Sequence, residues 1–371
     1  MGLIGATLSF IILISVLVGV HELGHLIAAR ANGVFVEVFS IGFGPVLCEF
    51  TDKKGTKWRI SLIPIGGYVK MFGDADASSV KETCPAGYTE EDMDRMSIHR
   101  KKPWQKLIVA ACGPIANFIL AIFVLILLAT IKGVPEYTPV ISPSGEDSIA
   151  YKAGVRDGDV VLKANEKDVK SFNDIVLAVR SSTGKDLSFE LKTSTNQIKQ
   201  IKIKMYKEEA GKIIPVKTIG ISPKETVYKR VSFVEAICSA VTTTYSIAYN
   251  NINGIIQMIT NKAETKNIGG IISIFKMSAE SAENGIATFS WMLAMLSVIL
   301  GAINLLPIPV LDGGTVIISA IEWIIGKPLN KKFVESIFMV GLVAVASLML
   351  LGIWNDLSKC KFFVFVENLF K

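Results

Sequence analysis

The chain has 371 residues, of which 50% are hydrophobic, and its mean hydropathy is +0.46. A chain of this length and hydropathy is too apolar for an ordinary water-soluble protein, so we expect several membrane spans. The formal net charge of +6 indicates orientation signals and attraction to anionic lipid, and without interleaved aromatic and basic residues we expect no nucleic-acid partner. The five cysteines are odd in number and none is spaced as CxxC, which argues against a disulfide framework or a thiolate zinc site.

The first predicted span covers residues 3–31 and contains a HExxH motif that begins at His21. Residues four apart lie on one face of a helix, so the imidazoles of His21 and His25 can reach one metal ion. Glu22 points about 100° away from His21 and is placed to deprotonate a water molecule at the metal. Such groups in a lipid-spanning helix are costly unless they pair or bind a metal, so we predict a zinc site rather than a polar cluster that packs helices.

Residues 33–105 are expected to form a soluble loop. Alternating apolar residues around the glycines of Gly42–Pro45 and Ile63–Met71 indicate short strands or a hairpin. Two interpretations remain open. The segment is either a plain surface hairpin or an edge strand beside the metal, which pairs with an unwound peptide substrate through its free backbone groups.

The second predicted span covers residues 107–131 and follows a basic run that begins at His99. No Lys or Arg precedes the first span, so the positive-inside rule puts the N-terminus outside the cell and this loop in the cytoplasm. His99 is expected to be a solvated loop residue. Asn117 is polar within the span, and it either makes a helix-packing hydrogen bond, which is the default expectation, or lines the active cavity.

Residues 132–226 are rich in Lys, Asp and Ser, and they contain alternating strand patterns at 186–191 and 200–205. They predict a single compact soluble domain, which the topology above places outside the cytoplasm. Residues 232–259 are moderately apolar but punctuated by Thr, Tyr and Asn. They predict an amphipathic helix at the outer membrane interface, with a further span as the alternative.

The third predicted span covers residues 286–306 and ends in Asn304–Gly314, where two prolines stop the helix. Asp312 lies beside this broken backbone and is the best-placed third metal ligand, the alternative being a cap of the next helix. Asn304 either donates a hydrogen bond to a substrate carbonyl or fixes the backbone. A fourth span over 333–351 returns the chain outside, so both termini are expected to be extracytoplasmic and the site to lie near the cytoplasmic leaflet.

In combination, these motifs resemble those of the bacterial site-2 proteases, and most closely the regulator of sigma E protease type. The matching strings are HELGH, GFGP, IPIGGYVKM, GPIANFILA, NLLPIPVLDGG and IIGKPL. The resemblance covers nearly the whole chain. It implies an intramembrane zinc metalloprotease of the bacterial cytoplasmic membrane, which hydrolyses peptide bonds within transmembrane segments of single-pass membrane proteins, such as an anti-sigma factor or a remnant signal peptide.

The resemblance also implies roles for individual residues. One zinc ion per chain would be held by His21, His25 and Asp312, with Glu22 as the general base. Asn304 would assist substrate positioning. A membrane-entering hairpin would contact the substrate through Gly66, Gly67, Tyr68 and Val69.

The expected fold is a polytopic α-helical membrane protein with about four spans, a cytoplasmic-side β-hairpin and one extracytoplasmic α+β domain. Residues 1–131 would form the first half of the membrane core and residues 227–371 the second half. Residues 132–226 resemble a PDZ domain of the circularly permuted bacterial kind. Such a domain implies a site for a peptide C-terminus or an unfolded segment, in addition to the transmembrane substrate and the lipid bilayer as partners.

Two other classes of function compete with this interpretation. One is a catalytically inactive, membrane-anchored PDZ adaptor with a vestigial metal site, but a relic has no reason to retain all four metal-site groups. The other is a transporter with an intramembrane metal. A transporter predicts repeated, symmetric broken spans, whereas the sequence contains one such break, at Pro307.

Overall fold

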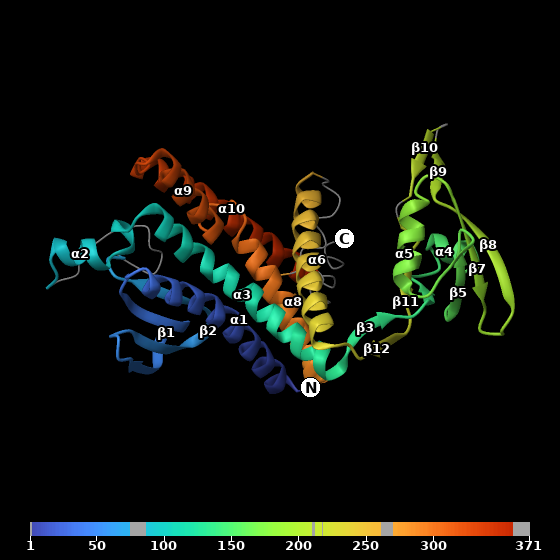
Figure 1. Cartoon of the computed structure of the whole chain (residues 1–371), viewed down its shortest axis with the longest axis horizontal. Coiled ribbons are helices and arrows are strands. Elements are labelled where there is room, and N and C mark those ends of the chain that lie inside the picture. The colour runs from blue at the N-terminus through green and yellow to red at the C-terminus, as the bar shows by residue number, and fades with distance from the viewer. Residues whose placement is uncertain (1, 75–86, 210–211, 217, 261–269, 359–371) are drawn as a thin grey trace, which may run out of the picture. The chain divides into compact units, whose positions relative to one another are not determined.

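The computed structural model of the chain describes residues 2–74, 87–209, 212–216, 218–260 and 270–358. These residues fold into two compact units, the first drawn from residues 1–128 and 237–371 and the second from residues 129–236. The elements of both units are labelled in Figure 1. Each unit is described separately below.

Among the described residues, four helices have the length and composition to cross a membrane. They are α1 (Leu3–Ala31), α3 (Pro103–Lys132), α8 (Ile286–Asn304) and α10 (Lys331–Ser358). The chain is therefore a polytopic membrane protein, as predicted. The sides of the membrane on which its loops and termini lie stay predictions.

Helix α1 is held by apolar packing at both ends. Towards its N-terminal half, Leu13 and Leu17 form a buried cluster with Met292 of α8, and Ile274 of α7 (Ile271–Glu283) packs against this cluster. Because lipid tails are as apolar as these side chains, van der Waals contact rather than removal from water stabilises such packing. A second cluster joins Leu26 and Ala29 to the first strand and to α3. The HExxH motif lies between the two clusters.

Helices α1 and α3 approach each other closely at small residues. A Cβ atom placed at Gly24 would lie 2.2 Å from the carbonyl oxygen of Cys112 and 2.8 Å from the Cβ of Ala116. Only glycine permits this separation of the two backbones, in the way that small residues do at other membrane helix interfaces. The close approach brings α3 within reach of the imidazoles on α1.

The predicted hairpin is present, but its strands are longer and more strongly bent than the sequence suggested. Strands β1 (Val36–Thr51) and β2 (Lys57–Met71) are antiparallel and cover one flank of α1 (Figure 1). Ile41 pairs with both Ile60 and Gly67, so the first half of β1 has a segment of β2 on each side. The strands bend at glycines in the left-handed region, of which Gly66 has φ +109°. The result is a small sheet of four strand segments.

An ion pair anchors the turn of this hairpin to the end of α1. Arg30 donates to the carboxylate of Asp52 and, over 2.7 Å, to the hydroxyl of Thr56. The indole of Trp58 donates to the same carboxylate at 3.0 Å. Burial alone would raise the pKa of Asp52, but hydrogen bonds from these side chains and from the Thr56 and Lys54 amides outweigh it and hold the pKa well below its usual range.

Three further helices lie in the described part of the first unit. Helix α6 (Phe233–Thr260) confirms the predicted helix, and its Ala240 packs with Ala121 of α3 and Ala294 of α8. It is not among the four candidate spans, and its position on or across the membrane stays a prediction. Helix α9 (Asp312–Ile325) follows the predicted break, and the short α2 (Glu90–Met96) and the 3-10 turn η1 (Ile98–Arg100) precede α3.

The described residues of the second unit form one antiparallel sheet and two short helices, α4 (Ile149–Lys152) and α5 (Phe172–Ser181). Its sheet has the order β11-β4-β5-β7-β8, with β6 paired to β5. These strands are β4 (Val140–Pro143), β5 (Asp159–Ala164), β6 (Lys167–Asp168), β7 (Asp186–Lys192), β8 (Ile198–Lys204) and β11 (Ile221–Pro223). Two strand pairs accompany the sheet: β3 (Val134–Tyr137) with β12 (Thr226–Lys229), and β9 (Tyr206–Glu209) with β10 (Lys212–Pro215).

The core of the second unit comes from alternating strand residues and one face of α5. Val161, Leu187 and Phe189 project from β5 and β7 and are buried together with Ile175 and Val179 of α5. The unit therefore has its own hydrophobic core, as a separate folded domain requires. Strands β7 and β8 coincide with the predicted strand patterns. The PDZ-like identity of the domain and its boundaries stay predictions.

Candidate metal centre

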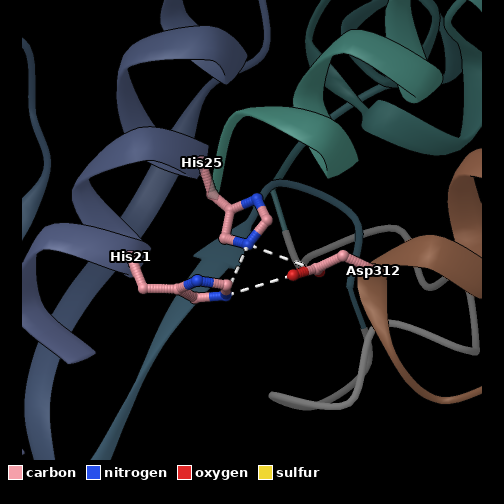
Figure 2. A group of neighbouring side chains, drawn as sticks. All are labelled: His21, His25 and Asp312. Carbon is pink, nitrogen blue, oxygen red and sulfur yellow. Dashed lines mark hydrogen bonds and ion pairs between the residues drawn. The ribbon is translucent and has the colours of Figure 1, made fainter. Parts of the chain in front are cut away.

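His21 and His25 lie one turn apart on the same face of α1 (Figure 2). Their ring centroids are 4.8 Å apart with an interplanar angle of 82°, and their Nε2 atoms are separated by 3.2 Å. His21 is only 8% exposed. Both Nε2 atoms therefore point towards one place in the protein interior, as the spacing of four residues predicts.

Asp312 reaches this pair from a distant part of the sequence. It is the first residue of α9, and its Oδ2 atom lies 3.1 Å from His21 Nε2 while its Oδ1 atom lies 3.4 Å from His25 Nε2 (Figure 2). The N-cap of α9 is Leu311 rather than Asp312. The aspartate thus faces the imidazoles, which favours the ligand interpretation over the capping alternative.

The turn that precedes α9 has a strained and closely packed backbone. Val310 has a φ of +89°, a conformation that is costly for a β-branched residue and that tends to occur at functional sites. A Cβ atom placed at Gly313 would lie 2.2 Å from the carbonyl oxygen of Leu306, and one at Gly314 would also meet backbone atoms of the same turn. The glycines after Asp312 are therefore required for its approach to α1.

The ligand atoms are close enough to share one metal ion. His21 Nε2 lies 3.2 Å from His25 Nε2 and 3.1 Å from Asp312 Oδ2, while Asp312 Oδ1 lies 3.4 Å from His25 Nε2. With one atom taken from each residue, the three atoms lie within 4.8 Å of one another, and ligands of a tetrahedral zinc ion lie about 3.4 Å apart. Within the described ranges, this is the one group of three or more His, Cys, Asp or Glu residues whose ligand atoms converge in this way. Two neutral imidazoles and a carboxylate suit zinc and leave a fourth position for water or substrate.

Glu22 is next to His21 on α1 and is turned towards the end of β2. The backbone amide of Val69 faces its carboxylate. A Cβ atom placed at Gly67 would lie 3.4 Å from Glu22 Cγ and 2.9 Å from Val18 Cγ1. The predicted general base therefore lies between the metal ligands and the last segment of the hairpin.

The structure divides the four predicted hairpin residues into two pairs. Gly67 and Val69 lie beside Glu22, as described above. Gly66 is at the bend, where a Cβ atom would meet the ring of Phe43 at 2.4 Å, and Tyr68 stacks on Phe43 with ring centroids 5.9 Å apart. The first pair thus lies next to the predicted general base, and the second pair contacts Phe43 at the bend of the hairpin.

Asn304 also lies at the cluster. It is the last residue of α8, and its side-chain Nδ2 is 3.4 Å from His21 Nε2. The end of α8 and the start of α9 therefore both contribute a side chain to the same place. An amide here is suitably placed to donate a hydrogen bond to a carbonyl group held at the metal position.

Helix α3 supplies a second layer of contacts that the sequence did not reveal. His25 Nδ1 lies 2.8 Å from the carbonyl oxygen of Val109, and His21 Nδ1 lies 3.2 Å from the amide of Asn117. A Cβ atom placed at Gly113 would lie 2.2 Å from His25 Nε2. Asn117 thus lines the metal cluster, whereas the default expectation was a hydrogen bond that packs helices. The polar residue of the GPIAN string was the sequence feature that pointed to this alternative.

His99 was expected to be solvated, and the structure corrects this. Its Nε2 atom lies 2.9 Å from Oδ1 of the buried Asp74, so it joins the end of the hairpin to the segment that precedes α3. The reason is tertiary: the hairpin returns to the start of α3, a pairing that a basic run in the sequence does not indicate. His99 is not part of the metal cluster.

Comparisons with known proteins agree with this geometry. The family model for peptidase family M50 matches residues 9–348 of the chain. "Putative zinc metalloprotease Atu1380" of Agrobacterium fabrum is 34% identical over 363 residues, which cover 96% of either chain. A protein of Rickettsia conorii with the same descriptive name is 36% identical over 95% of this chain and 98% of its own. Metalloprotease MmpA of Caulobacter vibrioides is 33% identical over 98% of either chain.

Proposed function

The chain belongs to peptidase family M50 and is a metalloprotease, and we propose on this premise that it cleaves peptide bonds within transmembrane segments of other proteins. One observation carries the proposal. Ligand atoms from α1 and α9 converge within 3.1–3.4 Å of each other in a protein whose candidate spans include α1 itself. A protease with its metal ligands in a span acts on bonds at the depth of the membrane.

The residues that would hold zinc are His21 and His25, through Nε2, and Asp312, through a carboxylate oxygen. When bound, zinc supplies Lewis acidity, which polarises a peptide carbonyl and lowers the pKa of a water molecule towards neutrality. The protein residues orient these groups. Asn304, at the end of α8, is placed to hold the carbonyl of the scissile bond by a hydrogen bond from its amide.

Glu22 acts as the general base and then as the general acid. It accepts a proton from the attacking water and returns that proton to the amine that leaves when the peptide bond breaks. Its position on α1 supports this role, because it is next to a metal ligand and faces the hairpin segment where a substrate would lie. The amide of Val69 helps to hold the carboxylate in place.

The last segment of β2 is the proposed substrate platform. It pairs with β1 along one edge, and within the described part of the chain no strand pairs with its other edge. A substrate helix hides its carbonyls in hydrogen bonds, so it must unwind before cleavage. This edge at Gly67–Val69 has no strand partner, although the Val69 amide faces Glu22, and it can receive the unwound backbone as an additional strand.

We also propose a location and an orientation. The protein lies in the bacterial cytoplasmic membrane, with the metal site near the cytoplasmic leaflet and with the termini and the second unit outside the cytoplasm. The basic residues between α1 and α3 support this topology. The second unit, as a PDZ-like domain, would bind a peptide C-terminus or an unfolded segment and so select trimmed substrates.

The competing adaptor function is not favoured, because an inactive relic would not be expected to keep convergent ligands and a base. The test is cleavage of a purified single-pass substrate by wild-type protein and by Glu22→Gln in the same lipid nanodiscs. We expect Glu22→Gln to lose cleavage while it retains about one zinc per chain. Cleavage at the wild-type rate by Glu22→Gln would overturn the proposed role of Glu22, and a wild-type protein that binds zinc without cleaving would support the adaptor.

A further inference from the structure

One face of α3 forms the outer wall of the metal cluster. Val109, Gly113 and Asn117 are spaced by four residues and therefore lie along the same face of the helix. Each of them meets an imidazole of the HExxH motif, two by polar contact and Gly113 by giving space to the ring of His25. The wall thus contacts both histidines, at the Nδ1 atom of each ring and along the ring of His25.

The contact at His25 defines which of its nitrogens carries the proton. Its Nδ1 lies 2.8 Å from the carbonyl oxygen of Val109, which can only accept a hydrogen bond. Nδ1 is therefore the donor, and Nε2, which faces Asp312, is left with its lone pair free for a metal. This is the usual arrangement of a metal-binding histidine, in which the second nitrogen is held by an oxygen acceptor.

At His21 the Nδ1 atom also has a partner on α3, but that partner is an amide nitrogen, which donates hydrogen bonds, rather than an oxygen acceptor. Asn117 is 0% exposed, and its Nδ2 atom lies 3.2 Å from His21 Nδ1, while its Oδ1 atom is buried with no hydrogen-bond partner. If His21 uses Nε2 for the metal, its Nδ1 carries the proton, and two donors would then face each other. A half-turn of the amide about its terminal bond exchanges oxygen and nitrogen without changing its shape. The buried oxygen then receives the proton of Nδ1.

The position of Asn117 is fixed independently of its amide. The hydroxyl of Ser297 on α8 donates a hydrogen bond of 2.8 Å to the backbone carbonyl of Asn117, and Ser297 is itself fully buried. Helix α8 also carries Asn304, which reaches the other nitrogen of His21. The ring of His21 is therefore held between α3 and α8, with the amide of Asn117 at Nδ1.

We propose that Asn117 is a positioning residue for the metal, whose side-chain oxygen accepts the Nδ1 proton of His21. With the Val109 carbonyl at His25, helix α3 then sets the tautomer and the direction of both imidazoles. The inference rests on the proposed zinc site and adds to it a residue that is not a ligand. Two residues of the GPIAN string then have a role. Gly113 leaves space for the ring of His25, and Asn117 accepts a hydrogen bond from His21.

The test compares two substitutions at position 117 in the full-length, detergent-purified protein. Asn117→Leu preserves the volume but removes the acceptor, whereas Asn117→Asp keeps an acceptor oxygen and removes the donor. The zinc dissociation constant is measured by competition with a chromophoric chelator. We expect Asn117→Leu to bind zinc about 10–100-fold more weakly than wild type, and Asn117→Asp to bind it at least as tightly as wild type. Asn250→Leu, an exposed asparagine of α6, is the matched control and should leave the constant unchanged.

A second readout separates ring orientation from charge and from folding. Cobalt(II) in place of zinc gives visible absorption bands that report the ligand geometry, and Asn117→Asp should retain the wild-type bands while Asn117→Leu alters them. The metal-free variants should share one elution volume and one thermal midpoint. Equal weakening by both substitutions, or none by Asn117→Leu, would overturn the inference while wild-type zinc binding leaves the proposed function intact. Failure of the wild-type protein to bind zinc would instead overturn the proposed function.

Discussion

The Nε2 atom of His21 lies 3.1 Å from Oδ2 of Asp312, although one residue lies in the first helix of the chain and the other begins α9. A contact between such distant segments depends on the whole arrangement of the membrane helices. It joins the HExxH helix to the broken segment after α8, so that the metal ligands can assemble only in the folded protein. The first prediction concerns a glycine that makes this assembly possible.

Gly113→Ala should abolish tight zinc binding. The added Cβ would lie 2.2 Å from His25 Nε2, a distance that forces the imidazole away from its position opposite Asp312. We expect at least a 10-fold increase in the zinc dissociation constant, in the range found when second-layer contacts to a metal ligand are lost, together with loss of cleavage. Zinc content after dialysis against a chelator measures the effect.

The matched control for this substitution is Gly254→Ala in α6, because a Cβ atom at Gly254 would meet no heavy atom within 4 Å. This variant should bind zinc as the wild type does. Wild-type zinc affinity in Gly113→Ala would show that the ring of His25 does not need the space beside α3.

Gly67→Ala should separate substrate binding from metal binding. Its Cβ would lie 2.7 Å from the carbonyl oxygen of Ser40 and 2.9 Å from Val18, so the last segment of β2 must move away from α1. We expect the zinc content to stay at the wild-type level while kcat/KM for a transmembrane substrate falls at least 10-fold, equivalent to about 1.4 kcal/mol of transition-state stabilisation. Loss of zinc in parallel with activity would contradict the assignment of this segment to the substrate.

Much of this site was accessible from the sequence because its signals are local. The spacing of His21 and His25 follows from helix periodicity, and the two prolines before Asp312 mark a broken span that needs a polar partner. The contacts from α3 were not accessible. Gly113 and Asn117 contact the imidazoles because α1 and α3 approach closely at Gly24. The sequence of α3 does not indicate which helix it packs against.

The fold shows the same division between local and long-range information. The four spans could be predicted because each is a continuous apolar run. The bent hairpin could be predicted only as short strands, since the pairing of Ile41 with both Ile60 and Gly67 depends on contacts far apart in the sequence. The link between His99 and Asp74 is of the same kind.

Asp52→Asn should destabilise the hairpin turn in a manner that depends on pH. The pKa of Asp52 is depressed in the folded protein, so its hydrogen bonds with Arg30 and Trp58 stabilise the fold above the unfolded pKa of about 3.9 and are lost as the pH falls through the lower folded value. The thermal midpoint of Asp52→Asn should therefore lie below that of wild type by a constant amount between about pH 5 and 7, above that ordinary pKa.

Below about pH 4 the difference between the two thermal midpoints should shrink, because the Asp52 carboxyl of the unfolded wild-type chain takes up a proton there while the folded one stays ionised. Differential scanning calorimetry of both proteins, in the same detergent and across this pH range, measures the difference between their thermal midpoints. A difference that grows as the pH falls would contradict the stabilising role of the ionised carboxylate.

Substrate helices with weak helical structure should be cleaved faster than strongly helical ones. The proposed free edge at Gly67–Val69 binds extended backbone, and residues such as Gly and Pro lower the cost of unwinding by about 1 and 3 kcal/mol relative to Ala. Paired substrates that differ only in a Gly or a Leu near the scissile bond should therefore differ about 5-fold or more in kcat/KM. Equal rates would contradict the requirement for local unwinding.

The most direct test of the central claim is the position of zinc itself. Anomalous diffraction at the zinc edge from crystals of the purified full-length protein should give one peak per chain, within about 2.0–2.2 Å of His21 Nε2, His25 Nε2 and a carboxylate oxygen of Asp312. The peak should disappear in crystals of Asp312→Asn prepared in the same way. A zinc ion held by other residues, or no peak between these three side chains in zinc-loaded crystals, would contradict the account.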